Sequence, residues 1–471
     1  MRATDPPVVA KTKAIIAASG RPQDVASLAQ GVVHWPPPRA ALRTAARLAA
    51  DAARAAESSD PAASSAAALL HSYGPTPGYP PLRAALRRRM ARWGLQGYEP
   101  VVTPGANCAF TVALIALCDE TDGVALFPPV YFNHKMSCQM LGGASRIMLA
   151  PVRERDLRPD LDWLERVCLG GGGSDGAADP PVLPLPKVVV LVNPANPTGI
   201  ALTRQELDRA ASLTARAGAW LLIDNTYADF TFDGREHYCP RGPNVVHLFS
   251  MSKAFGMMGW RIGWIALPPD EQEEAGEAAG HSSYGAGVAE DLGEGGLLLS
   301  EILKVQDSIP ICATQLSQAV ALAALEGDGG NDENDDDDFG DGFVSRRVAD
   351  LAANNRPIVR AALAAALGDD NVLGGEGGIY FFARLPPAFA ERARSVESGD
   401  DDVVRWLVAR AGVCVLPGSA CAAPGWLRVA FANLPPKECA AAAERLRAGL
   451  EELVRRGPAA LDGDDDKGGG S

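Results

Sequence analysis

A lysine and an arginine stand eight residues apart in the segment SMSKAFGMMGWRIGW, which runs from Ser250 to Trp264. The run before Lys253, NVVHLFS, and the run after Arg261, IGWIAL, are rich in apolar residues and predict two buried strands. Most lysines lie in solvent and have no specific role. The position between two buried strands indicates instead that these two cations belong to an active site.

Further polar groups follow other predicted strands. Asn196 comes after VVVLVNPA, Asp224 ends WLLID, and a helix start led by Gly105 follows a third strand. Pyridoxal phosphate (PLP) needs a lysine for a Schiff base, a carboxylate for its protonated ring nitrogen, and cations with helix-terminal N–H groups for its phosphate. Once substrate displaces the lysine, its free amine can move the proton between the substrate α carbon and the cofactor. The constellation therefore predicts a PLP enzyme with Lys253 at its centre.

The elements that must position these residues are short strands separated by helices. Between about Val101 and Leu267 the predicted strands are VALF, KVVVLVN, WLLID, VVHLFS and WIAL. Fully apolar strands that alternate with helices are typical of a mostly parallel sheet covered on both faces. Ligands of such sheets bind at the carboxyl ends of the strands, where Asn196, Asp224 and Lys253 fall. The expected fold class is α/β.

One helix between two of these strands is predicted with its ends. The segment TRQELDRAASLTARAG opens with a capping box, in which Thr203 and Glu206 have the required spacing. Leu207, Ala210 and Leu213 fall on one face, and Gly218 stops the helix. This pattern predicts a helix that packs one apolar face against the sheet.

The motifs taken together resemble those of the class I and II aminotransferases of PLP fold type I, and the likeness covers nearly the whole chain. It is carried by SMSKAFGMMGWRIGW, LLIDNTYADF, NPANPTG, VTPGANCAF and GWLRVAFAN. The resemblance implies a large three-layer αβα domain with a mostly parallel sheet and a smaller α+β domain. It also implies PLP as cofactor, amino acids and 2-oxo acids as substrates, a homodimer, and no metal.

The resemblance assigns roles residue by residue. It makes Lys253, Asp224 and Tyr227 catalytic: Lys253 forms the Schiff base, Asp224 pairs with the pyridinium, and Tyr227 bonds the phenolic oxygen. Tyr131 would stack on the ring and His134 would support Asp224. The remaining implied cofactor ligands are Asn196 at the phenolic oxygen and, around the phosphate, Gly105, Ala106, Asn107, Ser250, Ser252, Arg261 and Tyr73 of the partner subunit.

A narrower resemblance concerns the substrate. SLAQGVVHWPPP, GGEGGIYFFARLP, VVRWLVARAGVCVLPG, GMMGWR and VQDSIPICA are similar to segments of plant aromatic aminotransferases. Those enzymes use methionine or aromatic amino acids with phenylpyruvate or indole-3-pyruvate, in auxin and phenylalanine metabolism. The implied substrate-binding residues are Gly31, Trp35, Asn196 and Arg428.

The residue types near the substrate agree with an apolar side chain. Val32, Val33 and Trp35 lie in the segment that closes over the site in this family and favour aromatic or thioether groups. The alternative for Trp35 is that it only anchors the segment. Arg428 can grip a carboxylate through two parallel hydrogen bonds. Because no motif supplies a second arginine for a dicarboxylate, aspartate is a poor candidate, while 2-oxoglutarate stays open as acceptor.

Composition excludes several classes of protein. The 471 residues carry a net charge of −14, which disfavours nucleic acid, and no apolar run reaches the length of a membrane span. The segment 326–342 contains nine acidic residues and no basic one. The nine cysteines form no CxxC pair and mostly lie in apolar runs. They indicate reduced thiols in a cytoplasmic protein, without disulfides or structural zinc.

The expected domain organisation follows from these segments. Residues 1–69 would form an N-terminal segment and part of the small domain, 70–309 the large PLP-binding domain, and 310–460 a linking helix, ATQLSQAVALAALE, and the small domain. Four glycine-rich or acidic stretches are expected as flexible insertions or tail, namely 171–181, 271–296, 326–342 and 461–471.

The expected reaction is ping-pong transfer of an amino group through Lys253 between an aromatic amino acid or methionine and a 2-oxo acid. Two alternatives remain open. A PLP lyase acting on a sulfur amino acid would use the same first steps, so the motifs do not separate it from a transferase. A non-enzymatic protein on the same scaffold, with the acidic loops as partner surface, is disfavoured because the site residues are present.

Overall fold

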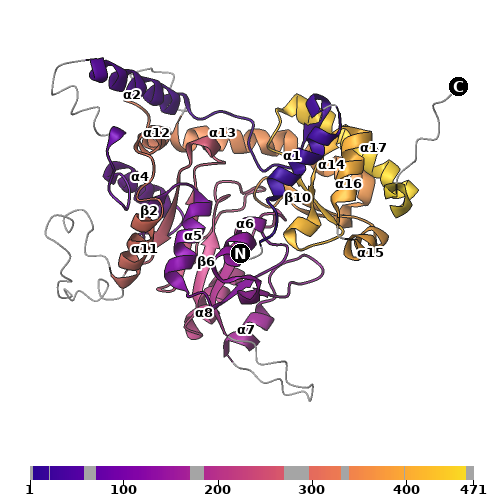
Figure 1. Ribbon diagram of the computed structural model, residues 1–471, viewed down its shortest axis with the longest axis horizontal. Helices are drawn as coiled ribbons and strands as arrows, with labels where there is room; N and C mark the ends of the chain where they lie inside the picture. Colours follow the sequence, from indigo (N-terminus) through magenta and orange to yellow (C-terminus); the bar gives the residue numbers. More distant parts are fainter. Residues whose placement is uncertain are drawn as a thin grey trace.

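The computed structural model describes residues 4–20, 22–57, 70–169, 185–269, 296–329, 339–396 and 398–462. Figure 1 shows a larger body around a central sheet and a smaller body that carries the C-terminal helices. The expected insertion 171–181 lies outside the described residues, as do 271–295 and 463–471 of the other expected insertion and tail.

The central sheet has seven strands in the order β2-β8-β7-β6-β5-β3-β4. Neighbours from β7 to β4 pair in parallel, whereas β8 is antiparallel to both β7 and β2. The predicted mostly parallel sheet is thus confirmed. Its strands are β2 (Glu99–Thr103), β3 (Gly123–Leu126), β4 (Ile147–Leu149), β5 (Pro186–Val192), β6 (Trp220–Asp224), β7 (Val245–Ser250) and β8 (Gly263–Leu267).

Helices cover both faces of this sheet. Residues of α5 (Ala106–Leu117) and α11 (Leu297–Ser308) share one apolar cluster with the strands, and residues of α7 (Leu161–Leu169) and α8 (Arg204–Arg216) share another. The capping box of α8 is present, because the Thr203 hydroxyl accepts from the Glu206 N–H at 3.2 Å and the Glu206 carboxylate accepts from the Thr203 N–H at 2.8 Å. The other helices of this body are α4 (Pro80–Ala91) and α6 (Phe132–Gly142).

The smaller body is built on a four-stranded antiparallel sheet in the order β12-β13-β10-β9. Its strands are β9 (Val372–Gly374), β10 (Tyr380–Arg384), β12 (Leu416–Pro417) and β13 (Trp426–Ala430). A separate parallel pair joins β1 (Ala26–Ser27) to β11 (Val413–Cys414). The helices are α1 (Val8–Ala18), α14 (Asn355–Leu367), α15 (Pro387–Ser395), α16 (Asp401–Ala411) and α17 (Pro436–Arg456).

The structure corrects two expected boundaries. Helix α12 (Gln315–Glu326) packs against α2 (Arg39–Glu57) and α4, so it stays with the large body together with α2. The helix between the two bodies is α13 (Gly340–Ala353), which lies between α12 and α14 in Figure 1. Residues 340–342, expected in the acidic insertion, form the first turn of α13, where Asp341 pairs with Arg89 and Arg92.

The cysteines of the described residues carry free thiols. All nine cysteines are unpaired, and six of them are buried, which agrees with the predicted reduced thiols. Within these ranges no group of three His, Cys, Asp or Glu side chains is arranged to hold a metal, and no helix combines the length and apolar character of a bilayer span.

Candidate active site

Lys253 lies at the carboxyl end of β7, in the turn that leads to Arg261 and β8. Its ammonium makes no hydrogen bond or ion pair with any part of the chain that the structure describes. Burial, together with the cations Arg261 and Arg428, lowers the pKa of Lys253 to about 8 against the opposing effect of Asp224. A neutral amine is therefore accessible near neutral pH, as a nucleophile or a proton carrier requires.

Asp224 ends β6 and is held by three hydrogen bonds. One carboxylate oxygen accepts from the Thr226 N–H at 2.9 Å and from the Thr226 hydroxyl at 2.7 Å. His134 Nε2 lies 3.1 Å from the other oxygen, in agreement with its predicted supporting role. Burial alone would raise the pKa of Asp224, but the contacts with His134 and Thr226 outweigh it and lower the pKa. The side chain is therefore a carboxylate at neutral pH.

The N-terminus of α5 and Arg261 form a positively charged end of the site. Gly105 stands before α5 with φ at +84°, a conformation that favours glycine, and a Cβ there would displace the Arg261 guanidinium. The guanidinium is held by the carbonyl oxygens of Met258 at 3.0 Å and Pro104 at 3.2 Å. Free N–H groups at the start of a twelve-residue helix beside a fixed arginine favour a phosphate.

Two serines predicted as phosphate ligands line the same turn after β7. Ser250 and Ser252 are both buried, and the Ser252 N–H donates to the Ser250 hydroxyl at 3.0 Å. This bond fixes the turn that leads into Lys253. The two hydroxyl groups are therefore placed on the same short segment as the lysine.

Asn196 and Arg428 meet, although 232 residues separate them in the sequence. Arg428 Nη1 donates to Asn196 Oδ1 at 2.8 Å, and its Nη2 donates to the Ala29 carbonyl at 2.6 Å. The buried Nε has no hydrogen-bond partner in the described structure. A buried guanidinium with an N–H group that lacks a hydrogen-bond partner can bind a substrate carboxylate.

Tyr131 stands at the start of α6, next to the positive end of the site. Its hydroxyl donates to Asn107 Oδ1 at 3.4 Å and accepts from Asn133 Nδ2 at 2.9 Å. Its ring lies edge-on to His134, with centroids 5.0 Å apart. Burial raises the pKa of Tyr131 to about 12, so the phenol is neutral. The structure thus places Tyr131 beside His134 and Asn107, and its contact with the cofactor ring stays a prediction.

Tyr380 is a site residue that the sequence analysis missed. Its hydroxyl lies 2.6 Å from the Tyr227 hydroxyl, and its ring lies 4.4 Å from the Arg428 guanidinium carbon. A Cβ at Gly31 would overlap the Tyr380 hydroxyl, which explains glycine at that position. The first four residues of β10 are all buried, so the strand has no alternating pattern that would single out Tyr380 from the sequence.

Tyr380→Phe is expected to reduce kcat by about 3- to 10-fold, because the hydroxyl that holds Tyr227 is lost while the ring under Arg428 remains. Steady-state kinetics of the holoenzyme would measure this change. The pH profile should change as well, since burial and Tyr380 both raise the pKa of Tyr227. Phe382→Tyr on the same strand is a control for general disturbance of β10. An unchanged kcat and pH profile in Tyr380→Phe would remove Tyr380 from the site.

Two predicted site residues, Trp35 and Tyr73, do not lie among the side chains that line the site in this chain. Trp35 is buried, donates from its indole to the Ala254 carbonyl at 3.3 Å and stacks on Phe230, so it anchors the segment to the turn after Lys253. This arrangement favours the anchoring alternative for Trp35. Tyr73 is 81% exposed, which leaves its predicted contact with a second subunit open.

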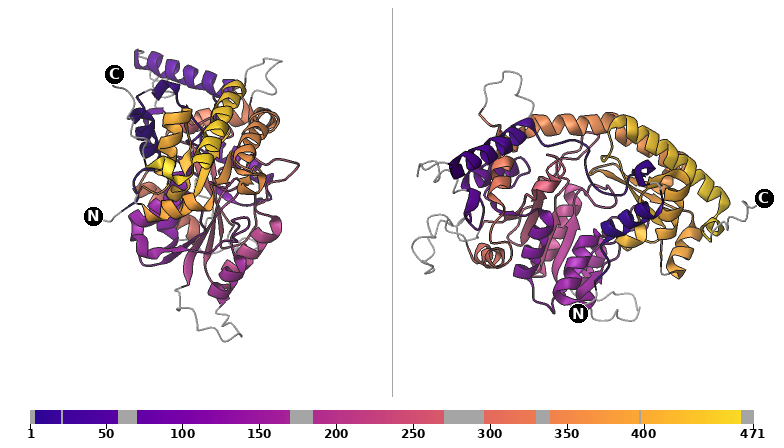
Figure 2. Two further views of the ribbon diagram at one scale, coloured as in Figure 1. Left: turned by 90° about the vertical axis from the view of Figure 1, so that its right-hand side faces the viewer. Right: turned by 45° about the horizontal axis from the view of Figure 1, so that its top comes forward.

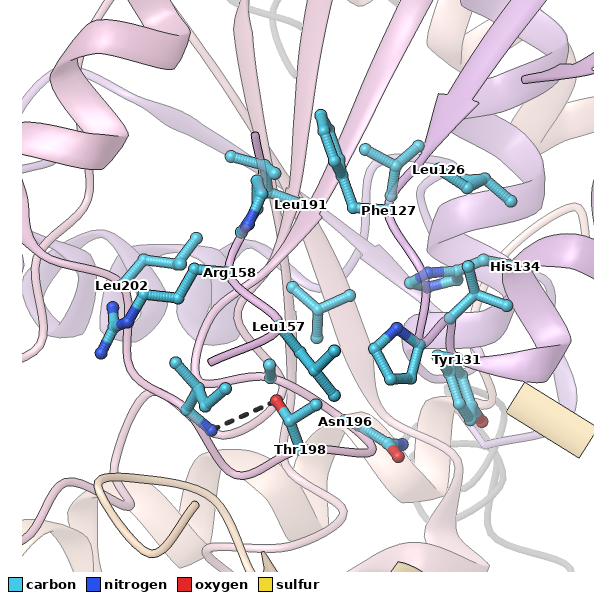
Figure 3. Close-up of a pocket in the computed structure, with 17 residues that line it drawn as sticks. Leu126, Phe127, Tyr131, His134, Leu157, Arg158, Leu191, Asn196, Thr198 and Leu202 are labelled. Atoms are coloured by element: carbon cyan, nitrogen blue, oxygen red, sulfur yellow. Dashed lines mark hydrogen bonds between the residues drawn. The ribbon is translucent and has the colours of Figure 1, made fainter. Parts of the chain in front are cut away.

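A small cavity adjoins the site, as Figure 3 shows. It borders Tyr131, His134 and Asn196 and has a volume of about 50 Å³. Most of the other side chains around it are apolar, including Leu157, and Lys253 does not line it. Because ligand pockets commonly reach about 300 Å³ or more, this cavity is no separate ligand site.

The residues present fit PLP. The unpartnered amine of Lys253, the carboxylate of Asp224 and the glycine-led start of α5 with Arg261 supply the covalent, ring-nitrogen and phosphate anchors respectively. The Tyr227 hydroxyl adds a donor for the phenolic oxygen. All come from segments at the carboxyl-terminal edge of the parallel strands or from the start of α5.

Comparison with known proteins gives concordant results. The family described as aminotransferase class I and II matches residues 32–446. The aromatic aminotransferase ISS1 of Arabidopsis thaliana is 40% identical over 455 residues, which cover 96% of each chain.

Two solved structures share the fold. An aspartate aminotransferase of Thermus thermophilus, a single mutant, superposes with a TM-score of 0.70 and 22% identity over 96% of this chain and 97% of its own. An aromatic aminotransferase of Pyrococcus horikoshii OT3 gives 0.66 and 22% over 93% of this chain and 99% of its own.

Proposed function

Because the chain belongs to the class I and II aminotransferases and is a PLP-dependent transaminase, we propose that its substrates are aromatic amino acids or methionine, with 2-oxo acids such as indole-3-pyruvate or phenylpyruvate. The observation that carries the proposal is the 40% identity, over 96% of both chains, to a protein named as an aromatic aminotransferase. A role in auxin metabolism would follow from such substrates.

The surroundings of Arg428 support an apolar substrate. The guanidinium carbon lies 4.4 Å from the ring centroid of Tyr380 and 5.9 Å from that of Phe132. Aromatic walls beside the carboxylate anchor favour an aromatic or thioether side chain over a charged one. Arg428 itself would bind the α-carboxylate and fix the α carbon near Lys253.

The chain's own residues account for the proton transfers. PLP, when bound, draws electrons from the substrate α carbon as its proton leaves. Lys253, whose pKa of about 8 makes a neutral amine available, accepts that proton and returns one to the cofactor side. Asp224, as a carboxylate, would pair with the protonated ring nitrogen of the cofactor, and Arg428 would orient the substrate. One amino acid and one 2-oxo acid pass through the same site in turn, in a ping-pong cycle.

A homodimer is also part of the proposal. Tyr73 is 81% exposed, and the Thr76 hydroxyl donates to Asp307, which lies two residues before the exposed Ile309. Large apolar side chains left exposed on a single chain favour an interface with a second copy. In a dimer Tyr73 would reach the phosphate end of the neighbouring site.

The proposed location is the cytoplasm. Nine unpaired cysteines, most of them buried, agree with a reducing compartment. Labelling of the denatured protein with and without prior reduction would show the same nine thiols if this is correct.

A paired assay tests the substrate proposal. One reaction contains L-methionine and indole-3-pyruvate, the other L-aspartate and 2-oxoglutarate, each with PLP-loaded protein. Tryptophan formed in the first reaction, at a rate at least about tenfold above aspartate turnover in the second, is the expected result. Turnover of the aspartate pair alone would overturn the substrate class and leave the aminotransferase activity standing. Release of ammonia and a 2-oxo acid from methionine alone would identify elimination instead.

A further inference from the structure

The N-terminal segment ahead of α1 is attached to α6, the helix that carries His134. The Asp5 N–H donates to Gln139 Oε1 at 2.9 Å, and Gln139 Nε2 donates back to the Asp5 carboxylate at 3.1 Å. Lys135 forms an ion pair with the same carboxylate at 2.7 Å. Three polar contacts therefore fix this segment on the large body, at the helix that begins beside Tyr131.

Helix α1, which follows this segment, lies on the small body. It packs on α16, and Figure 1 shows it beside the C-terminal helices. Val8 and Ile15 are buried in the apolar core, and Lys11 forms an ion pair with Asp401, whose side chain is only 4% exposed. Residues 5–18 therefore connect α6 of the large body to the first turn of α16 in the small body.

The residue before Asp401 makes a second connection. Asp400 is fully buried, and its carboxylate accepts from the Ser419 N–H at 2.8 Å and from the Gly425 N–H at 2.9 Å. These bonds hold the loop that contains η5 (Gly418–Cys421). The Cys421 carbonyl in turn accepts from the Val130 N–H at 2.9 Å, across the boundary between the two bodies.

Both connections end on one short stretch of the large body. The first reaches Lys135 and Gln139 on α6, and the second reaches Val130, the residue before Tyr131. Tyr131 and His134 lie between these attachment points, and His134 touches Asp224 at 3.1 Å. A shift of the small body would therefore be transmitted to Tyr131, the residue before α6, and to His134 in its first turn.

We infer that Asp5, Lys11 and the Asp400–Asp401 pair form an interdomain clasp that positions Tyr131 and His134 for catalysis. The members of the clasp are positioning residues, because none of them touches Lys253, Arg428 or Asp224. The inference rests on the aminotransferase activity and is independent of which amino acid is the substrate.

Asp5→Ala and Lys11→Ala open the first connection at two different links, and both replaced side chains are about 40% exposed. Asp5→Ala leaves the partly exposed Lys135 without its carboxylate, whereas Lys11→Ala leaves the buried Asp401 carboxylate without its cation. Each is expected to lower kcat by about two- to fivefold, the factor that a half-exposed ion pair supplies. Each should also shift the pH midpoint of the absorbance of the bound cofactor, because His134 contacts the carboxylate at the ring end. Asp51→Ala, which removes two exposed ion pairs within α2, is the matched control and should change neither quantity.

Double variants distinguish an effect on the position of His134 from a general loss of rigidity in the protein. If the two links act in series, Asp5→Ala combined with Lys11→Ala should be no slower than the slower single variant. If the clasp acts through His134, adding Asp5→Ala to His134→Gln should lower kcat by less than about 1.5-fold. If the fold-reductions in kcat of the two single changes multiply in either double variant, the inference is wrong. It is also wrong if Asp5→Ala and Lys11→Ala both keep the kcat and the cofactor absorbance of the wild type. Asp5→Glu should restore part of the lost rate, because the charge facing Lys135 returns.

Discussion

Lys253→Ala is expected to abolish amino-group transfer, with a fall in kcat of about 10⁴-fold, the upper end of what one proton-transferring group contributes. The physical reason lies in the environment of the amine. Burial and the cations Arg261 and Arg428 lower its pKa to about 8, and no other described residue occupies its place between β7 and β8. Transfer of the amino group from the preferred donor, followed by chromatography of the product, would measure the loss.

The same pKa sets a pH dependence for loading. Only the neutral amine attacks an aldehyde, so covalent attachment of PLP to the free protein should accelerate as the pH rises toward about 8 and level off above it. Lys253→Arg should show no attachment at any pH, because a guanidinium stays protonated. Lys187→Ala changes an exposed lysine of β5 and serves as the control. Substantial transfer by Lys253→Ala would assign the proton transfers to another group.

The parts of the fold predicted from sequence are those set by local patterns. The capping box at Thr203 and the apolar face of α8 are determined within a dozen residues, and the structure reproduces both. Strands β6 and β7 are mostly apolar and almost wholly buried because helices cover both faces of the sheet. The polar residue that ends such a strand lies at the ligand edge, and Asp224 could therefore be placed without coordinates.

The parts that were missed depend on contacts between distant segments. Nothing near Tyr380 in the sequence indicates that its hydroxyl meets Tyr227, 153 residues away. The helix that joins the two bodies was placed at α12, because a long apolar pattern does not say which neighbour it packs against. Trp35 has a similar ambiguity: a large aromatic residue fits a substrate wall or an anchor, and only its bond to Ala254 shows the anchoring contact.

Asp224→Asn is expected to lower kcat by about 10²- to 10³-fold, the usual effect of removing one preorganised electrostatic group. Asparagine has nearly the same shape and still accepts from Thr226, but it carries no charge for the ring nitrogen. The contacts with Thr226 and His134 keep the pKa of Asp224 below its ordinary value despite burial, so the wild-type charge persists through neutral pH and is lost only in acid. Steady-state kinetics at saturating substrate would measure the fall.

The same variant shows whether Asp224 accelerates the reaction or only strengthens cofactor binding. Lys253 and the positive end formed by α5 and Arg261 are untouched in Asp224→Asn, so cofactor affinity should fall much less than kcat. Thr226→Val provides a graded comparison, because it removes one hydrogen bond from a carboxylate that keeps its charge, and a fall of about tenfold or less is expected. Equal losses in kcat and in cofactor affinity for Asp224→Asn would mean that the carboxylate binds the cofactor without increasing its reactivity. A loss confined to kcat would show that the negative charge of Asp224 accelerates the reaction. The buried contacts with His134 and Thr226 are then needed as well, because they keep Asp224 ionised.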